Sequence, residues 1–170
     1  MVTFAHKLKL KRMKKIILCA ILLFAFSSLY AQNRLVVSKK DFTLTVISPT
    51  QDTLACFKCA VGLNPGDKQR VGDKRTPEGT FSIVSIEDSR HWTHDFNDGA
   101  GPRPYAYGPY FIRLKTPGWS GIGIHGTCFP ETVGTNSSEG CIRLKNDDIV
   151  SLRKLVNKGD QVVILKNPDL

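Results

Sequence analysis

A histidine and a cysteine, sixteen residues apart, are the side chains best suited to do chemistry in this sequence: His125 and Cys141. A thiol becomes an effective nucleophile when a neighbouring imidazole takes its proton. Gly140, just before the cysteine, lets the backbone turn tightly, so that successive N–H groups can point at one developing oxyanion. The pair therefore predicts a cysteine nucleophile for acyl transfer.

Each of these residues also has a plain structural interpretation. Alone, Cys141 would be taken for a buried thiol and His125 for a core histidine. Both stand in glycine-bearing segments, which favours the catalytic interpretation. Cys128 follows His125 by three residues, and for this thiol a structural, redox-sensitive or disulfide-bonded role is favoured over a catalytic one.

The first 31 residues have the layout of a secretory signal peptide. Met13 and two lysines precede the apolar run Ile16 to Phe26, and small and polar residues lead to Ala31. The apolar run is shorter than the roughly 20 residues that span a bilayer. We expect cleavage after Ala31, a single domain at residues 32–170, and membrane contact only through the signal segment before cleavage. The mature protein would lie in the periplasm or cell wall, and Met13 is an alternative start.

Most of the excess positive charge belongs to this N-terminal segment. The segment holds six of the 24 Lys and Arg residues and none of the 15 acidic ones, so the net charge falls from +9 to +3 without it. The main support for a nucleic-acid partner disappears, and we expect no such partner. The remaining 139 residues suit one domain with an adequate core.

Four cysteines follow the signal segment, and export would place them in an oxidising compartment. If Cys141 stays free, at most one disulfide can form. Cys56 and Cys59 lie three apart in a predicted strand and point to opposite faces, so a bridge between them is unfavourable. A bridge from Cys128 to either one stays open, as does the role of small buried hydrophobes. A metal site built from these three thiols and His125 is a weaker alternative, because it leaves the residues around Cys141 unexplained.

Short apolar and β-branched runs between turn residues predict a mainly β domain, most simply a barrel or sandwich, with one helix near the C-terminus. The expected strands are 34–37, 42–46, 53–61, 81–86, 110–114, 121–124 and 161–165. The strand at 121–124 delivers His125. Asn146 is expected to cap a helix from Asp147 to about Asn157.

The segment from Asp88 to Gly108 shows no periodicity, and a loop of this length in a small domain is commonly a lid. Its polar and aromatic side chains suit the wall of a binding site: His91, Trp92, His94, Asp95, Arg103, Tyr105 and Tyr107. His91, His94 and Asp95 could also suggest a metal site, but their spacing matches no strong zinc pattern. We expect no metal and no other cofactor.

Two segments resemble elements of the L,D-transpeptidase catalytic domain (YkuD-like) family. The first runs from His125-Gly126-Thr127 through a spacer to Ser138-x-Gly140-Cys141-Ile142-Arg143-Leu144, and the second is the turn Thr76-Pro77-Glu78-Gly79. With the strand pattern, the resemblance covers about residues 34–166. It implies an L,D-transpeptidase-like β barrel or sandwich with a capping C-terminal helix, in a bacterial cell-wall enzyme that acts on peptidoglycan stem peptides.

The resemblance also implies roles for single residues. Cys141 would attack the carbonyl of the third stem residue, release the terminal D-alanine and hold the product as a thioester, and His125 would act as the base. An amine would then take the acyl group, or water in an L,D-carboxypeptidase. The oxyanion hole would be formed by the backbone N–H groups of Glu139, Gly140 and Cys141. Substrate contacts are expected at Ser138, Arg143, Gly126, Thr127, Trp119, Arg103 and Tyr107. For Ser138 the alternative role is to shape the loop before Cys141. Arg143 would either bind a carboxylate of the substrate or fix this loop.

Glu139 departs from the family pattern, because many members carry histidine at this position. A carboxylate aimed at Cys141 would raise the pKa of the thiol and repel the oxyanion. We therefore expect Glu139 to point away from the thiol, with the free amine of the substrate as one partner. The departure also leaves open a second class of function, a non-catalytic peptidoglycan-binding domain of the same fold.

Overall fold

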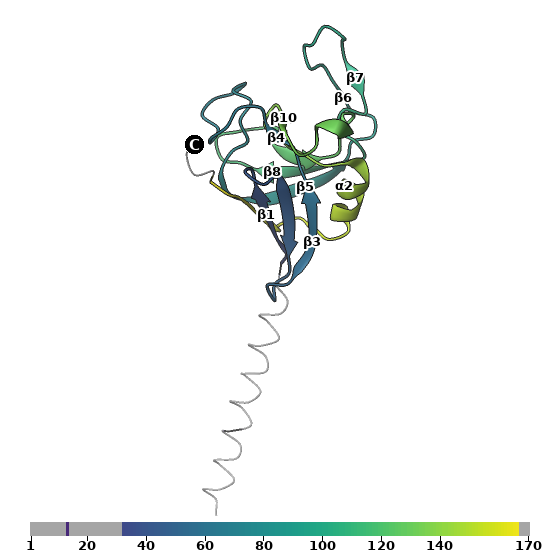
Figure 1. The fold of residues 1–170 in the computed structure, drawn as a ribbon. Coiled ribbons are helices and arrows are strands. Elements are labelled where there is room, and N and C mark those ends of the chain that lie inside the picture. Colours follow the sequence, from purple (N-terminus) through teal and green to yellow (C-terminus); the bar gives the residue numbers. More distant parts are fainter. Residues whose placement is uncertain (1–12, 14–31, 167–170) are drawn as a thin grey trace, which may run out of the picture. The chain divides into compact units, whose positions relative to one another are not determined.

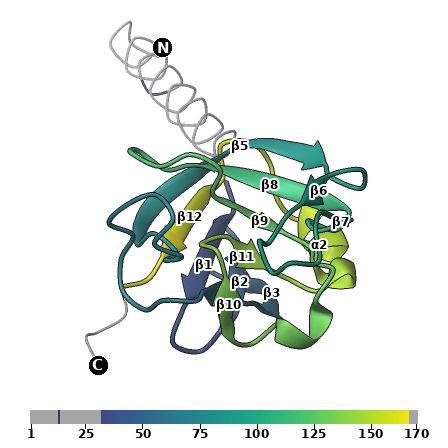
Figure 2. The ribbon, with the colours of Figure 1, turned by 90° about the horizontal axis from the view of Figure 1, so that it is seen from above.

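A computed structural model describes Met13 and residues 32–166, so the expected signal peptide lies, apart from Met13, outside the described residues. The mainly β prediction with one C-terminal helix is confirmed. Eight strands form one sheet in the order β11-β9-β8-β5-β12-β1-β2-β3, and this sheet curls like a half-barrel (Figures 1 and 2). Within the described residues no helix is long and apolar enough to cross a membrane.

The strands of the main sheet are β1 (Arg34–Ser38), β2 (Thr43–Ile47), β3 (Thr53–Lys58), β5 (Gly79–Asp88), β8 (Tyr110–Lys115), β9 (Gly123–His125), β11 (Ile142–Arg143) and β12 (Gln161–Ile164). Two small sheets pair β4 (Val61–Gly62) with β10 (Asn136–Ser138), and β6 (Thr93–His94) with β7 (Arg103–Pro104). A short 3-10 turn, η1 (Pro130–Thr132), and the helix α2 (Asn146–Arg153) complete the fold.

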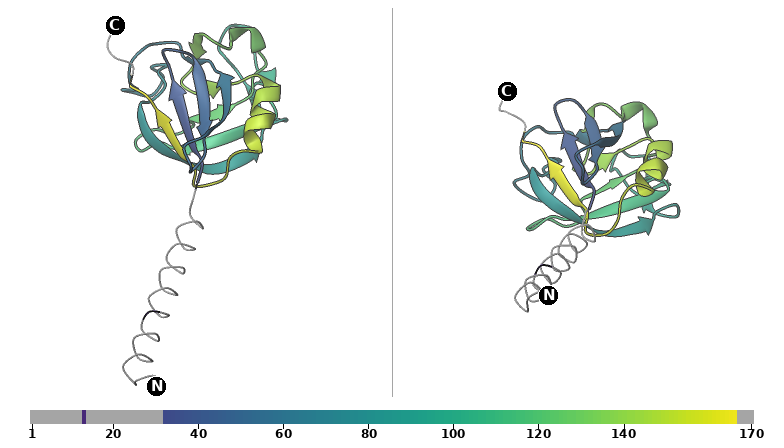
Figure 3. Two further views of the ribbon diagram at one scale, coloured as in Figure 1. Left: turned by 60° about the horizontal axis from the view of Figure 1, so that its bottom comes forward. Right: turned by 90° about the horizontal axis from the view of Figure 1, so that it is seen from below.

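Two neighbouring strands in the middle of the sheet, β1 and β12, come from opposite ends of the described sequence. β1 pairs with β2 in antiparallel fashion, with Leu35 opposite Val46, and alternate residues of both strands are buried. On its other side β1 pairs in parallel with β12, with Leu35 beside Val162 (Figure 3). This arrangement puts the first and last strands of the domain next to each other.

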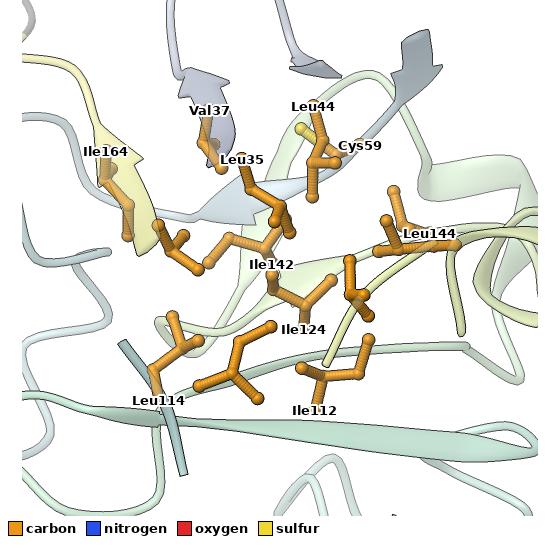
Figure 4. Close-up of a cluster of buried hydrophobic side chains, with 14 of the residues drawn as sticks. Leu35, Val37, Leu44, Cys59, Ile112, Leu114, Ile124, Ile142, Leu144 and Ile164 are labelled. Carbon is orange, nitrogen blue, oxygen red and sulfur yellow. The ribbon is translucent and has the colours of Figure 1, made fainter. Parts of the chain in front are cut away.

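The core lies directly beneath the predicted active-site residues. Ile112, Ile124 and Ile142, on β8, β9 and β11, are fully buried and belong to the same cluster as Leu35 and Leu44 (Figure 4). Cutting back a buried isoleucine of this kind to alanine costs about 2–5 kcal/mol. Because Ile124 and Ile142 are the chain neighbours of His125 and Cys141, core packing fixes the backbone that carries both groups.

The helix is shorter than predicted. α2 begins at Asn146 and ends at Arg153, not Asn157, and Lys145 is its N-cap residue. After Arg153 the chain continues in tighter turns, in which the Leu155 N–H donates to the Leu152 carbonyl. Capping by the Asn146 side chain was a wrong prediction, because that amide bonds elsewhere.

Two other predicted segments contain structure that the sequence pattern did not indicate. The expected strand at 53–61 breaks after Lys58, and its last part forms β4 in a different sheet. The segment 88–108, predicted to be irregular, contains the β6–β7 hairpin, which projects from the body of the domain (Figure 1). Its strands have two residues each, too few to produce a recognisable alternation.

Candidate active site

The cysteine and the histidine come together because their strands are neighbours. β9 and β11 pair in parallel, with Ile124 opposite Ile142. Cys141 comes just before Ile142 and His125 just after Ile124, and both line one cavity of about 240 Å³. The cavity is lined by residues of the loop before β5, of the predicted lid, of the β8–β9 loop with β9, and of the segment around Cys141. These residues are Lys68, Val71, Gly72, His94, Phe96, Ala106, Tyr107, Trp119, Ser120, Gly121, Ile122, His125, Ser138, Glu139, Cys141 and Arg143.

The tautomer of His125 follows from a backbone contact. Its Nδ1 lies 2.5 Å from the carbonyl oxygen of Gly126, and a carbonyl can only accept. Nδ1 therefore carries the proton and Nε2 has the free lone pair. The side chain is buried, and this desolvation lowers the pKa of His125 to about 3, although the bond to Gly126 opposes the shift. The imidazole is neutral at rest and able to accept a proton at Nε2.

Two aromatic rings hold the imidazole in place. Phe111 is stacked on His125 at 5.4 Å between ring centroids, and Tyr107 meets it edge-on at 4.9 Å. The Phe111 ring needs the absence of a side chain at Gly123, where a Cβ would lie 2.4 Å from its Cε1 atom. This glycine in β9 thus makes room for the ring that orients His125.

Cys141 rests as a thiol. Burial raises its pKa to about 11, while a backbone hydrogen bond from Gly123 and the nearby charges of Arg143 and Arg113 act in the lowering direction. Its Sγ lies 3.3 Å from the Gly121 carbonyl oxygen, to which the thiol donates. The protein therefore holds a neutral thiol and a neutral imidazole, and the ion pair of a thiolate and an imidazolium is not its resting state.

The loop before the nucleophile is closed by Ser138. Its hydroxyl donates to the Cys141 carbonyl at 2.5 Å and accepts from the Gly140 N–H at 3.1 Å. Gly140 has φ +131°, and a Cβ there would lie 2.9 Å from the Arg75 carbonyl oxygen, so glycine meets both a conformational and a steric requirement. Ser138 is buried and shapes the loop, and the Gly140 N–H expected in the oxyanion hole is occupied in this state.

Arg143 is buried beside the thiol without a carboxylate partner among the described residues. Its Nη2 donates to Ser137 Oγ at 3.0 Å, whereas its Nε is buried with no hydrogen-bond acceptor. Arg143 also pairs with His125 across the two strands and lines the cavity. It thus fixes the loop and keeps donor capacity for a ligand, so both roles considered for it are compatible with its position.

The hydrogen-bond partner of the Glu139 carboxylate is His94 of β6. Its Oε2 accepts from His94 Nε2 at 2.7 Å, and His94 Nδ1 lies 3.1 Å from the Tyr107 hydroxyl. Glu139, His94 and Tyr107 are thus linked by successive hydrogen bonds, and the Tyr107 ring packs against His125. Glu139 and the predicted lid are therefore connected directly.

The predicted substrate contacts divide into two groups. Trp119 and Tyr107 line the cavity. Gly126, Thr127 and Arg103 do not: Arg103 pairs with Asp98 at 2.9 Å and lies over the Phe129 ring. In the expected lid, only His94 and Tyr107 of the proposed wall residues reach the cavity, while Phe96 and Ala106 join them without having been singled out.

Two residues that contact the candidate site were not predicted as site residues from the sequence. Asn146 bonds the backbone of Thr127 through both ends of its amide, at 2.9 and 3.1 Å, and so fixes the turn after His125. Lys68 lines the cavity, pairs with Asp73 at 2.7 Å and lies 5.6 Å from the Trp119 ring centroid. Neither residue belongs to a local motif, since each acts on a segment that is distant in sequence.

The four cysteines of the described residues are all free thiols. Cys59 is buried, and desolvation raises its pKa to about 12, whereas Cys56 is exposed on β3. No group of three or more His, Cys, Asp or Glu side chains within residues 32–166 is placed to hold a metal ion. The thiolate metal site and the site at His91 and His94 both lack geometric support there.

Solved structures with the same curled sheet define the class of fold. L,D-transpeptidase 3 from Mycobacterium tuberculosis, in complex with a faropenem-derived adduct, superposes with a TM-score of 0.62 at 20% identity, covering 80% of this chain and 61% of that one. The helical cell shape determining protein Pgp2 from Campylobacter jejuni gives 0.63 at 22% identity, covering 82% and 49%. The fold is that of L,D-transpeptidases.

The sequence comparisons agree with the fold. Residues 32–164 match the L,D-transpeptidase catalytic domain family model, and this chain belongs to that family. It is 37% identical over 95 residues to the putative L,D-transpeptidase YqjB of Bacillus subtilis, covering 54% of this chain and 53% of that protein. It is 25% identical over 148 residues to the probable L,D-transpeptidase YcfS of Escherichia coli, covering 79% and 44%. The chain spans about half the length of these curated relatives.

Proposed function

We propose that this chain is an exported L,D-transpeptidase that forms a thioester between Cys141 and the third residue of a peptidoglycan stem peptide. The observation that carries the proposal is the shared cavity of a Cys141 thiol and a His125 whose Nδ1 proton is held by Gly126. That contact leaves Nε2 as the nitrogen that can accept the thiol proton.

In the first half-reaction the proton moves from Cys141 Sγ to His125 Nε2 as sulfur attacks the substrate carbonyl. Burial disfavours both separated charges at rest, so proton transfer and attack are expected to be coupled. The imidazolium then gives the proton to the amine of the departing D-alanine, which breaks the C–N bond and leaves the thioester.

The oxyanion is assigned to the backbone N–H groups of Glu139 and Cys141. The Gly140 N–H already donates to Ser138 Oγ, and it could join only if that bond opened. The guanidinium of Arg143 supplies positive charge to the cavity lining, which suits a carboxylate of the donor peptide.

In the second half-reaction an amine attacks the thioester and His125 takes its proton. Water in place of the amine would make the protein an L,D-carboxypeptidase. The proposed partner is the peptidoglycan stem peptide, and the proposed site of action is the periplasm or cell wall, reached through cleavage of the signal peptide at residues 1–31.

Intact-mass measurement with a carbapenem tests the proposal. The expected result is one covalent adduct per molecule on the protein expressed as residues 32–170, with none on Cys141→Ala. Cys128→Ala serves as the matched control, because this thiol lies between His125 and Cys141 in the sequence but does not line the cavity. An unmodified wild-type protein would instead support a non-catalytic binding domain.

The reaction itself is tested on muropeptides. Cells expressing the wild-type protein are expected to differ from cells with Cys141→Ala in cross-links, stem-peptide length or attached protein. Identical muropeptide profiles would count against the enzymatic function, even if a carbapenem labels the thiol.

A further inference from the structure

We propose that Glu139, oriented by His94, is the binding subsite for a positively charged acceptor amine in the second half-reaction. The inference rests on the proposed transpeptidase function and assigns the chemical class of the acceptor, a primary ammonium group.

The carboxylate is placed at the mouth of the cavity. Glu139 lines the cavity together with Cys141, and 42% of its side chain is exposed. Its Oε2 accepts from His94 Nε2, while its Oε1 takes part in none of the hydrogen bonds among the described residues. One oxygen is thus used to orient the group, and the other can accept from a ligand.

His94 makes this orientation specific. An ionised carboxylate can only accept, so Nε2 of His94 carries a proton, and in the neutral ring Nδ1 accepts from the Tyr107 hydroxyl at 3.1 Å. The Tyr107 ring in turn lies against His125. The chain Glu139–His94–Tyr107 therefore holds the carboxylate at a fixed position relative to the base that must deprotonate the amine.

The charges that line the cavity favour binding of an ammonium group at Glu139. Glu139 is the single acidic residue among those that line the cavity, while Lys68 and Arg143 are cations. An incoming ammonium is repelled by the two cations and attracted to the carboxylate. A donor carboxylate has the opposite preference, so it is attracted to Lys68 and Arg143, whereas the ammonium is attracted to Glu139.

The position of Glu139 carries a cost in the first half-reaction. Its charge is among the influences that raise the pKa of the Cys141 thiol, which opposes thiolate formation. A carboxylate here is unfavourable for acylation and favourable for amine binding. Removal of this charge should therefore weaken transfer to an amine without slowing acylation.

The transfer step balances without another reactant. The bound ammonium loses one proton to bulk water, and the free amine attacks the thioester carbonyl. The C–N bond forms and the C–S bond breaks, while the second proton passes to His125 Nε2 and from there to Cys141 Sγ. Glu139 binds and orients the amine, and it forms no covalent bond.

The test separates the half-reactions. With a disaccharide-tetrapeptide as donor and acceptor, mass spectrometry gives the ratio of cross-linked dimer to hydrolysed tripeptide, and a carbapenem gives the acylation rate. Glu139→Gln is expected to lower the dimer-to-tripeptide ratio about tenfold, through loss of a charge-assisted hydrogen bond, without slowing acylation. His94→Ala is expected to lower the same ratio, because the carboxylate loses its orientation.

Controls and a neutral acceptor make the result specific. Glu131→Gln and His91→Gln lie in the same two loops, outside the cavity, and should leave the ratio unchanged. Transfer to hydroxylamine, which is uncharged at neutral pH, should be unaffected by Glu139→Gln. An unchanged ratio, or an equal fall in acylation and transfer, overturns the inference; failure of the wild-type protein to be acylated would overturn the proposed function instead.

Discussion

The side-chain amide of Asn146 brackets the peptide backbone of Thr127 from both sides. Its Oδ1 accepts from the Thr127 N–H at 2.9 Å, and its Nδ2 donates to the Thr127 carbonyl at 3.1 Å. Thr127 is two residues beyond His125, so both hydrogen bonds act on the turn that follows this histidine. A residue in the first turn of α2 therefore fixes the turn that follows β9, the strand that ends in His125.

Asn146→Ala should weaken both the fold and the site. Removing the amide leaves a backbone donor and an acceptor without partners, which costs about 1–3 kcal/mol of unfolding free energy. We expect urea denaturation to show this loss and carbapenem acylation to slow, because the His125 turn becomes less constrained. Asn157→Ala is the matched control, since its exposed side chain makes no hydrogen bond among the described residues. Equal stability of the two variants would contradict the bracing role.

Gly123→Ala should displace the ring that orients His125. The new Cβ would meet Phe111 Cε1 at 2.4 Å and the Ile112 carbonyl oxygen at 2.8 Å, and overpacking of this kind costs about 1–3 kcal/mol. Acylation is expected to fall more than stability alone explains. Gly134→Ala provides the comparison, because it has φ +98° but no atom within 4 Å of its Cβ. If both variants acylate at the same rate, stacking on Phe111 does not position the imidazole.

Stability should decrease in acid because of His125. Its folded-state pKa is about 3 against 6.5 for the free side chain, so its contribution is complete above pH 6.5. Between pH 6.5 and 3 the unfolded chain binds a proton that the folded chain does not, and stability falls by up to about 1.4 kcal/mol per pH unit. Urea unfolding from pH 7 to pH 4 should show a steeper decline for the wild-type protein than for His125→Gln. Parallel curves would mean that the folded protein accommodates a charged His125.

The free thiols should differ widely in reactivity. Cys56 is exposed, whereas Cys59 is fully buried with its pKa raised to about 12 by desolvation. In native protein, iodoacetamide should label Cys56 within minutes and leave Cys59 unlabelled until urea is added. Peptide mapping by mass spectrometry gives the order, and rapid native labelling of Cys59 would contradict the buried position.

Local pattern was sufficient for most of the sheet, because alternation and turn residues mark strands such as β1, β2 and β8. The same pattern did not predict features that depend on contacts between segments distant in sequence. The helix ends at Arg153 although Leu155 and Val156 continue its apolar pattern, and Asn146 serves Thr127 instead of capping the helix.

For the candidate site, the motif around Cys141 and His125 predicted two residues that the structure places in one cavity. The motif gave no indication that Ser138 would occupy the Gly140 N–H, or that His94 would bind Glu139. His94 and Glu139 are 45 residues apart, and their contact depends on where the fold places the base of the β6–β7 hairpin relative to the loop before Cys141. Sequence spacing carries no information about such a contact.

The position of β12 has a consequence for the geometry of the site. β12 lies between β1 and β5, so it joins the sheet half β3-β2-β1 to the half β5-β8-β9-β11, which carries His125. It pairs in parallel with β1 and in antiparallel fashion with β5. The isolated bridge between Ala60 and Arg143 is a second link, from the segment after β3 to β11. The strands that carry the site residues are therefore held against the first half of the sheet at two separate places.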